Sequence, residues 1–249
     1  MTLLLDIGNS RLKWALARGR EFVGHGAAAH GGDRIEPALG DQLAALPRPD
    51  QVWVANVAGS AMAEIVSRLC ADLWSLTPEF ATVQRERLGL TTEYGDLARL
   101  GVDRWLGLLA AWDSRHRPLC VAACGTALTV DLADAGGRHL GGYIVPGLDL
   151  MQDSLMANTA GIRERGAAPP TADPGFSTSA CVNNGCGMAA AAFIDRCGKA
   201  VRERFGDTAF CVMTGGAADL IRPLLVEDFK LDPLLVLRGL ALIAAGART

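Results

Sequence analysis

Asp6 ends a short apolar run at the start of the chain, and the turn signal Gly8-Asn9 follows it. Glycine lets the backbone come close to a ligand, and the amide groups of such a turn form a concavity that holds anions. Asp6 could bind magnesium, directly or through water, because this ion prefers carboxylate, water and phosphate oxygens. Lys13, in the next apolar segment, could meet a phosphate charge. Taken alone, however, this motif is more often an ordinary hairpin with an Asx turn.

A second copy of this pattern lies 117 residues further along the chain. At that shift the matched pairs are Gly8 with Gly125, Asn9 with Thr126, Gly19 with Gly136, Val23 with Leu140 and Gly24 with Gly141. Few residues are identical, so chance similarity is the alternative, but glycines in register at three separated places favour a gene duplication. Two such turns facing each other would clamp the phosphate tail of a nucleotide.

A third glycine motif, Met213-Thr214-Gly215-Gly216-Ala217, follows an apolar segment and begins a predicted helix. Such helix N-termini accept phosphate or nucleoside groups, although in isolation a plain β–α turn is the commoner explanation. Two matched hairpins followed by strand, Gly-Gly and helix are the layout of the actin, sugar-kinase and Hsp70-type ATPases. Neither a G-x-G-x-x-G after the first strand nor a Walker A sequence is present. We therefore predict an α/β protein with a duplicated ribonuclease-H-like fold of the actin-like ATPase type.

Hydrophobic periodicity predicts the elements that position these motifs. In the first half we expect strands at Leu3–Ile7, Leu12–Ala17 and Val52–Val57, and helices at Asp33–Leu46, Ala63–Leu73 and Leu100–Trp112. In the second half we expect strands at Leu119–Ala123, Leu128–Ala133 and Ala209–Met213, and helices at Gly187–Phe205, Ala217–Leu225 and Pro233–Ala247. The segment Gly166–Gly175 predicts a loop. The polar segment Ser114–Pro118 is the predicted boundary between halves at residues 1–115 and 116–249.

Charge and composition narrow the class of protein. The chain has 249 residues, a net charge of −3 and no run of lysine or arginine, so the electrostatic surface of a nucleic-acid binder is absent. Its seven cysteines form no C-x-x-C pair and its four histidines are scattered, which argues against a zinc site and favours reduced thiols. No segment has the roughly 18 apolar residues that span a bilayer, and the first apolar run is too short for a signal peptide. We expect a cytoplasmic protein that binds neither nucleic acid nor membrane.

Taken together, the short motifs resemble the type III pantothenate kinases, also called the Bvg accessory factor family, over nearly the whole chain. The pieces are Asp6-Ile7-Gly8-Asn9-Ser10 with Lys13, Tyr94, Leu100-Gly101-Val102-Asp103-Arg104, Gly125-Thr126-Ala127 with Thr129 and Asp131, Gly141-Gly142-Tyr143-Ile144-Val145-Pro146-Gly147, Thr178 with Gly185, and Thr214-Gly215-Gly216. The resemblance implies transfer of a phosphoryl group from ATP to pantothenate, giving 4′-phosphopantothenate in the first step of coenzyme A synthesis. It also implies a homodimer in which two chains build the pantothenate pocket together.

The resemblance further implies a role for each matched residue. The residues that would contact ATP are Asp6, Ile7, Gly8, Asn9, Ser10, Arg11, Leu12, Lys13 and Thr126. The residues that would bind pantothenate are Tyr94, Gly101, Val102, Asp103, Arg104 and Thr178. Magnesium would accompany ATP at Asp6.

Asp103 would act as the base that accepts the proton of the substrate hydroxyl. Phosphoryl transfer needs positioning, charge stabilisation and a carboxylate that orients the hydroxyl and takes its proton. The neighbouring Arg104 would keep Asp103 ionised or meet anionic oxygens. Without the resemblance, Gly-Val-Asp-Arg would be interpreted as a helix N-cap, since Asp103 starts an apolar-periodic segment.

One position departs from the family pattern. The second hairpin of the family begins Asp-x-Gly-Thr, and that Asp is linked to a potassium or ammonium ion, whereas this chain has Ala123 there. Backbone carbonyls and Asp131 could still supply oxygens. We therefore expect the monovalent cation site to be weakened.

Two other functions stay open at this point. Another small-molecule kinase of the same fold is possible, because a fold does not fix a substrate. A non-enzymatic regulator is the second, although the intact Asp6, Asp103 and Thr126 argue against loss of catalysis. The segment Leu100–Trp112 is apolar on more than one face, which predicts a helix in the homodimer interface, with burial inside one chain as the alternative.

Overall fold

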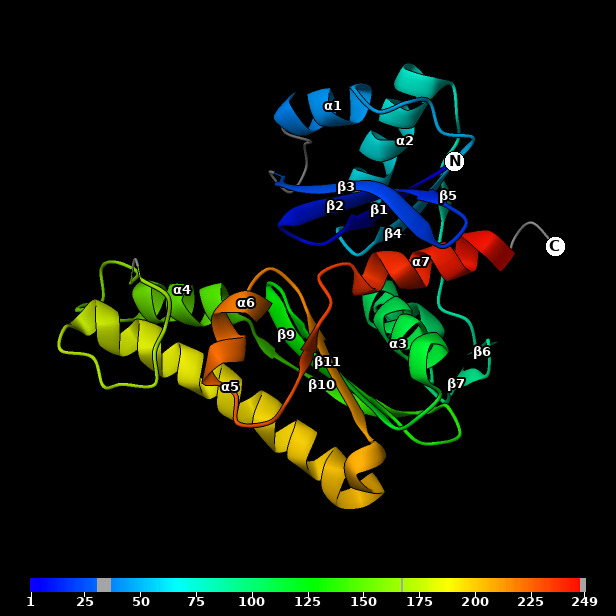
Figure 1. The fold of residues 1–249 in the computed structure, drawn as a ribbon. Coiled ribbons are helices and arrows are strands. Elements are labelled where there is room, and N and C mark those ends of the chain that lie inside the picture. Colours follow the sequence, from blue (N-terminus) through cyan, green and yellow to red (C-terminus); the bar gives the residue numbers. More distant parts are fainter. Residues whose placement is uncertain (31–36, 167, 247–249) are drawn as a thin grey trace. The chain divides into compact units, whose positions relative to one another are not determined.

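The computed structural model describes residues 1–30, 37–166 and 168–246, which form two compact units (Figure 1). The first unit contains Met1–Arg85, Tyr94–Ala110 and the C-terminal segment from Leu234, and the second contains Glu86–Glu93 and Ala111–Pro233. The chain therefore passes between the units four times. A single boundary at residue 115 does not describe these units. The hairpin 86–93 lies in the first half of the sequence but belongs to the second unit, and the last helix lies in the second half but belongs to the first unit.

The first unit is built on a five-stranded sheet of order β3-β2-β1-β4-β5. The strands are β1 (Thr2–Ile7), β2 (Arg11–Arg18), β3 (Glu21–Ala29), β4 (Gln51–Asn56) and β5 (Glu79–Phe80). The first three form an antiparallel meander, while β4 runs parallel to β1 and β5 parallel to β4. All six residues of β1 are buried, as is typical of a central strand covered on both faces.

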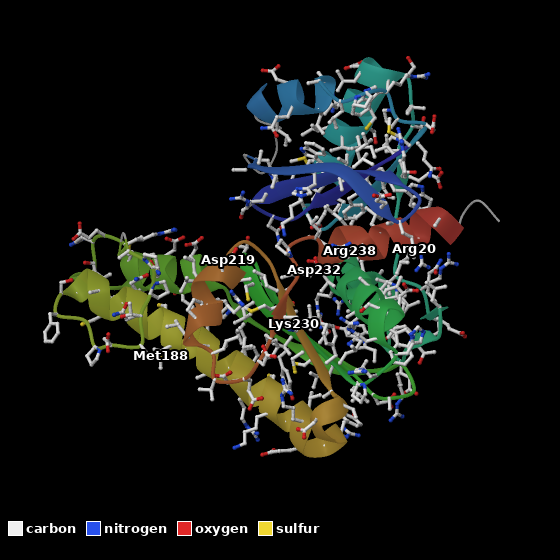
Figure 2. The ribbon with its side chains drawn as sticks, in the orientation of Figure 1. Arg20, Met188, Asp219, Lys230, Asp232 and Arg238 are labelled. Atoms are coloured by element: carbon white, nitrogen blue, oxygen red, sulfur yellow. The ribbon has the colours of Figure 1, made fainter. Side chains whose placement is uncertain are left out.

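Helices cover both faces of this sheet. One face packs on α1 (Pro37–Ala44) and α2 (Ser60–Trp74), and Leu3 and Leu5 of β1 share one hydrophobic core with Val66 of α2. The other face is covered by α7 (Leu235–Gly246), as Figure 1 shows. Arg238 of α7 is marked in Figure 2, and its guanidinium carbon Cζ lies 5.4 Å from the centre of the Phe22 ring on β3.

The helix α3 (Val102–Arg115) follows the 3-10 turn η1 (Leu97–Arg99), and its apolar residues are buried within the single chain. Trp105, Leu106, Leu108 and Leu109 have no accessible surface, and Trp112 is 5 % exposed. These side chains therefore need no second chain to cover them, and a dimer interface that includes this helix stays a prediction. Their pattern is explained by packing inside one chain, which was the alternative.

Gly239 of α7 lies directly against α3, since a Cβ added there would sit 2.7 Å from the carbonyl carbon of Leu106 and even closer to its oxygen. We expect Gly239→Ala to lower the free energy of unfolding by about 1–3 kcal/mol, because the two helices would have to separate. The control is Gly40→Ala in α1, where an added Cβ meets nothing within 4 Å. That change should be neutral or stabilising, because alanine favours helix. Urea unfolding of both variants measures the difference, and equal stabilities would contradict it.

The second unit carries a seven-stranded sheet of order β12-β11-β8-β9-β10-β7-β6. Its strands are β6 (Glu86–Arg87), β7 (Leu90–Thr92), β8 (Leu119–Cys124), β9 (Ala127–Ala133), β10 (Arg138–Pro146), β11 (Phe210–Thr214) and β12 (Lys230–Leu231). Its helices are α4 (Leu148–Asn158), α5 (Thr178–Phe205) and α6 (Ala218–Ile221), with 3-10 turns η2 (Gly206–Thr208) and η3 (Arg222–Leu224). The core lies between this sheet, α5 and α6, and includes Met213, Ile194 and Ile221.

The two sheets repeat one topology, β3-β2-β1-β4-β5 against β10-β9-β8-β11-β12, so the predicted duplicated ribonuclease-H-like fold is confirmed. The register differs by one residue in the second strand of each copy. Asp6 pairs with Lys13 in the first copy, while Ala123 pairs with Thr129 in the second. The second hairpin turn is shorter, because Gly125 N donates to Ala127 O, whereas Gly8 N donates to Arg11 O.

Several element boundaries differ from the sequence predictions. α5 begins at Thr178, nine residues before the predicted Gly187, because Ser177 caps it by accepting a hydrogen bond from Ala180 N at 3.2 Å. The helix predicted at Ala217–Leu225 is the single turn α6 followed by η3. The start of the helix predicted at Asp33–Leu46 lies outside the described residues, and the described part of Gly166–Gly175 is a loop.

All seven cysteines are free thiols, and only Cys181 is exposed. In the described part of the chain, no helix is both long and apolar enough to cross a membrane.

Candidate active site

The strand β1 delivers Asp6 to the first hairpin turn, where Gly8 N donates to Arg11 O at 3.0 Å. Lys13 returns on β2 and pairs in register with Asp6. Asp6 is only 9 % exposed, and Lys13 is half-buried. The carboxylate and the ammonium group therefore lie side by side at the end of a central strand.

Burial has a strong effect on the Asp6 carboxyl. It raises the pKa of this group from 3.8 to about 7, because a buried carboxylate loses hydration; Lys13 lowers the pKa and Asp103 raises it. The contribution of Asp103 means that the two carboxyl groups, 97 residues apart in sequence, are electrostatic neighbours in the first unit. Two neighbouring carboxylates beside one lysine form a site where a bound cation would relieve the repulsion.

Asp103 lies in the first turn of α3, and its Oδ1 accepts a hydrogen bond from Arg104 N at 2.8 Å. Gly101 holds the N-cap position, since its carbonyl accepts the hydrogen bond of Trp105 N at 3.1 Å. The interpretation of Asp103 as the N-cap is therefore wrong by two residues. A side chain at Gly101 would clash with the carboxylate, because an added Cβ would lie 2.6 Å from Asp103 Oδ1.

The other residues predicted to bind pantothenate in this segment surround Asp103 in sequence. Val102 and Arg104 are both 8 % exposed, and Tyr94 is half-buried. The carbonyl oxygen of Tyr94 accepts a hydrogen bond from Arg85 Nη1 at 3.0 Å. The first unit thus brings together the magnesium candidate Asp6, the phosphate candidate Lys13 and the candidate base Asp103.

The second hairpin turn, in the other unit, is held between two helix starts. Gly147, at the N-terminus of α4, donates its amide to Thr126 O at 2.9 Å, and Ala217 N donates to Cys124 O at 3.0 Å. A Cβ at Gly147 would lie 2.6 Å from Thr126 O, and one at Gly215 would lie 2.7 Å from Cys124 N. Sequence reasoning missed these close approaches. The signal was the two glycines themselves, because only glycine fits against another backbone so closely.

The Gly215-Gly216 motif differs from its sequence interpretation. Gly215 has φ of +103°, which favours glycine, and the helix after it has only four residues. One helical turn aligns too few peptide dipoles to make an anion site by itself. The motif supports the second hairpin turn, and a phosphate-binding role for it stays a prediction. Thr126 is exposed on that turn, and Thr178 is exposed at the first position of α5.

Ala123 lies at the end of β8, between Thr129 of β9 and Thr214 of β11 in register. Both threonines are buried, and the Thr214 hydroxyl has no hydrogen-bond partner among the described residues. Asp131 is 2 % exposed, and its Oδ1 accepts a hydrogen bond from His139 Nε2 at 3.0 Å. The carboxylate that could supply an oxygen near Ala123 is therefore hydrogen-bonded to an imidazole through one of its two oxygens.

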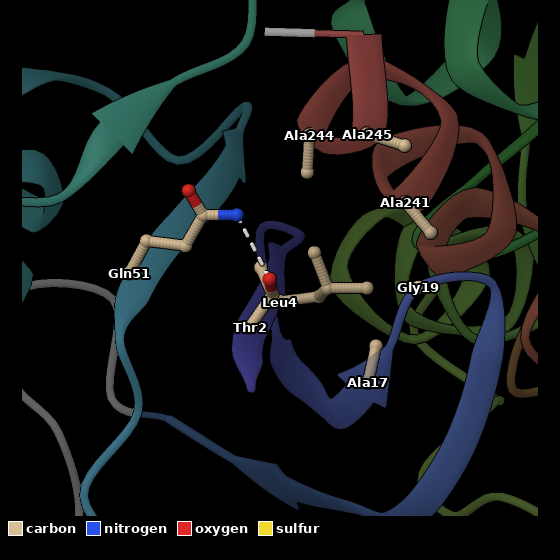
Figure 3. Close-up of a pocket in the computed structure, with 8 residues that line it drawn as sticks. All are labelled: Thr2, Leu4, Ala17, Gly19, Gln51, Ala241, Ala244 and Ala245. Atoms are coloured by element: carbon tan, nitrogen blue, oxygen red, sulfur yellow. Dashed lines mark hydrogen bonds between the residues drawn. The ribbon is translucent and has the colours of Figure 1, made fainter. Parts of the chain in front are cut away.

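A separate small cavity of about 100 Å³ lies in the first unit (Figure 3). It is lined by residues of β1, β2, the β2–β3 turn and β4 on one side and by three alanines of α7 on the other. On the sheet side, Gln51 Nε2 donates to Thr2 Oγ1 at 2.8 Å. None of the residues predicted to bind ATP or pantothenate lines this cavity.

Known proteins match the chain along nearly its whole length. A family model described as type III pantothenate kinase matches residues 2–200. A type III pantothenate kinase of Nitrosococcus oceani is 40 % identical over 250 aligned positions, which cover 98 % of this chain and 94 % of the relative.

Solved structures share the fold at lower identity. A Campylobacter jejuni protein assigned to a Baf family of transcriptional activators is 18 % identical with a TM-score of 0.63, covering 99 % of this chain and 100 % of that one. A Sinorhizobium meliloti protein described as a 2-dehydro-3-deoxygalactonokinase is 15 % identical with a TM-score of 0.54, covering 99 % of both chains. At these identities the likeness supports the fold alone.

Proposed function

The chain belongs to the type III pantothenate kinase family, and we propose that it transfers the γ-phosphoryl group of ATP to pantothenate, forming 4′-phosphopantothenate for coenzyme A synthesis. The observation that carries this proposal is the neighbourhood of Asp6, Lys13 and Asp103 in the first unit. A metal-binding carboxylate, a phosphate-binding cation and a second carboxylate are the groups that such a transfer needs.

Asp6 is the residue that would hold magnesium, directly or through water. The donor set fits this ion, because a buried carboxylate beside a second carboxylate favours a cation, and phosphate oxygens would complete its coordination. Bound magnesium would neutralise charge on the transferring phosphoryl group. Lys13, paired with Asp6, would contact the phosphates, while Gly8, Asn9 and the remaining hairpin residues from Ile7 to Leu12 would hold them through the turn.

Asp103 would accept the proton of the pantothenate hydroxyl as the oxygen attacks phosphorus. Its carboxylate is fixed by the Arg104 amide and is permitted by the missing side chain of Gly101. A base held in one orientation loses little entropy in the transition state. Tyr94, Val102 and Arg104 would bind pantothenate around it, and Thr126 and Thr178 of the second unit would contribute to ATP and pantothenate binding respectively.

Mass spectrometry of the acceptor tests this proposal. We expect pantothenate incubated with ATP, magnesium and the protein to gain one phosphoryl group, while sugar and acetate acceptors remain unmodified. Phosphorylation of a sugar instead would favour another kinase of the same fold. Absence of any phosphorylated acceptor would favour a non-enzymatic regulator.

We also expect turnover to depend little on potassium or ammonium. The side chains beside Ala123 in register are neutral threonines, so the carboxylate of the family pattern is missing there, and Asp131 already accepts a hydrogen bond from His139 through Oδ1. Turnover in Tris buffer should therefore change little as potassium or ammonium is added. The matched variant Ala123→Asp should gain a dependence on potassium. A steep potassium requirement in the unmodified protein would contradict this prediction.

A homodimer in the cytoplasm completes the proposal. The family resemblance supports the dimer, and the seven free thiols agree with a reducing compartment. A monomeric mass by light scattering at micromolar concentration would contradict the dimer.

A further inference from the structure

A buried hydrogen-bonded chain in the second unit has no part in the proposed chemistry. Thr92 Oγ1 and His139 Nδ1 are hydrogen-bonded at 3.0 Å, and His139 Nε2 is hydrogen-bonded to Asp131 Oδ1 at 3.0 Å. The three residues are 1 %, 5 % and 2 % exposed. Burying three polar side chains costs free energy unless they are hydrogen-bonded. A buried network of satisfied hydrogen bonds also makes the local structure rigid.

The chemistry of the three groups gives the chain a direction. A carboxylate only accepts hydrogen bonds, so His139 Nε2 donates to Asp131. In the neutral imidazole, Nδ1 is then the acceptor, and the Thr92 hydroxyl donates to it. The Asp131 carboxylate thus selects the tautomer that can hold Thr92.

Thr92 lies on the thinly attached strand β7. The strand has three residues and pairs with β10 through only Thr91 with Arg138 and Thr92 with His139. With so few pairs to β10, the buried hydrogen bond of Thr92 adds a side-chain link between the two strands, beside the backbone bond from Thr91 N to Gly137 O at 2.9 Å. Tyr94, the first predicted pantothenate residue, follows Thr92 by two positions.

The hairpin 86–93 is also held at its other side. Trp112 Nε1 donates to Leu88 O at 3.2 Å, and Trp112 belongs to α3, the helix whose first turn carries Asp103. The Trp112 ring also packs closely on Gly137, since a Cβ added to this glycine would lie 2.7 Å from the ring. The residues on both sides of the segment Tyr94–Ala110 therefore belong to the second unit. Those before the segment form the hairpin itself, and Trp112, just after it, is hydrogen-bonded to the hairpin.

We propose that Asp131, His139 and Thr92 are positioning residues that fix the segment from Tyr94 to Arg104 for binding of the pantothenate acceptor. None of the three touches substrate in this account. They act through β7, whose position sets where the acceptor-binding segment leaves the sheet. The inference rests on the proposed function, because it assigns Tyr94 and Asp103 to the acceptor.

The test compares Thr92→Val, which removes the hydroxyl at nearly constant volume, with Thr92→Ser, which keeps it. We expect Thr92→Val to lower kcat/KM for pantothenate on the order of 10- to 100-fold, as small displacements of binding residues do. The Kd for ATP, measured without pantothenate, should stay within about twofold of the unmodified protein. Thr92→Ser should restore most of the loss, and Thr91→Val, on the neighbouring half-buried residue of the same strand, should leave both values unchanged.

Asp131→Asn provides a second, milder variant, because its amide oxygen still accepts from His139 while the charge is lost. We expect a smaller but selective loss in kcat/KM for pantothenate. An unchanged kcat/KM for pantothenate in a folded Thr92→Val or Asp131→Asn protein would overturn the positioning role. An equal loss in ATP affinity would also overturn it, since that result indicates general destabilisation. Failure of the unmodified protein to phosphorylate pantothenate would instead refute the proposed function.

Discussion

Replacing Asp103 with asparagine should lower kcat by about 10²–10⁴-fold, which is the usual contribution of a general base. The amide keeps the size of the side chain and can still accept the hydrogen bond from Arg104 N, so α3 should begin at the same place. It cannot take the proton of the acceptor hydroxyl. The Kd for ATP should not rise, because removing one of two neighbouring carboxylates reduces repulsion of the phosphates.

Asp113→Asn is the matched control, since Asp113 is a half-buried aspartate of the same helix outside the proposed site. It should retain turnover close to that of the unmodified protein. If purified Asp103→Asn also turned over at the unmodified rate, Asp103 would not be the base.

Replacing Asp6 with asparagine should have two opposite effects. Turnover should fall by at least about 10²-fold, because the residue that would hold magnesium loses its charge. The protein without ligands should become more stable at pH 8. The pKa of Asp6 is about 7 in the folded protein and 3.8 when exposed, so folding favours the protonated carboxyl.

The sign follows from proton binding in the two states. Between pH 4 and pH 7 the folded protein binds more protons at Asp6 than the unfolded chain, so this group lowers stability as pH rises. Asparagine has no such penalty. The gain in unfolding free energy should be on the order of a few kcal/mol at pH 8 and should shrink as pH falls toward 4.

Urea unfolding of the magnesium-free protein at pH 4, 6 and 8 measures this difference. Asp72→Asn, an exposed residue of α2, is the control and should change stability little at any of these pH values. A less stable Asp6→Asn protein at pH 8 would show that the buried carboxyl is stabilised by interactions stronger than its desolvation.

The sequence predicted the features that depend on local pattern. The central strands, the repeat and the turn at Gly8 follow from alternating apolar residues and glycine, so they were recognisable without the structure. The motifs around Asp6 and Asp103 identified two charged groups, and their roles in the site stay predictions. That these two carboxyl groups are electrostatic neighbours was not readable, because tertiary contact between distant segments has no local signature.

What the sequence did not reveal has physical causes as well. The apolar faces of α3 indicated only that the helix is covered, and packing inside the chain covers it as well as a partner would. The two-residue strand β6 and the three-residue strand β7 are too short for a periodic pattern, so the hairpin that precedes Tyr94 in the sequence was missed. His139 was one of four scattered histidines until the sheet placed it between Thr92 and Asp131.

The central claim is that this chain phosphorylates pantothenate at the expense of ATP, and a coupled assay of ADP release tests it most directly. With ATP and magnesium present, ADP release should start only when pantothenate is added and should equal the amount of phosphorylated product. ADP release that ignores pantothenate, or no release at all from folded protein at saturating ATP and pantothenate with potassium and ammonium supplied, would contradict the claim.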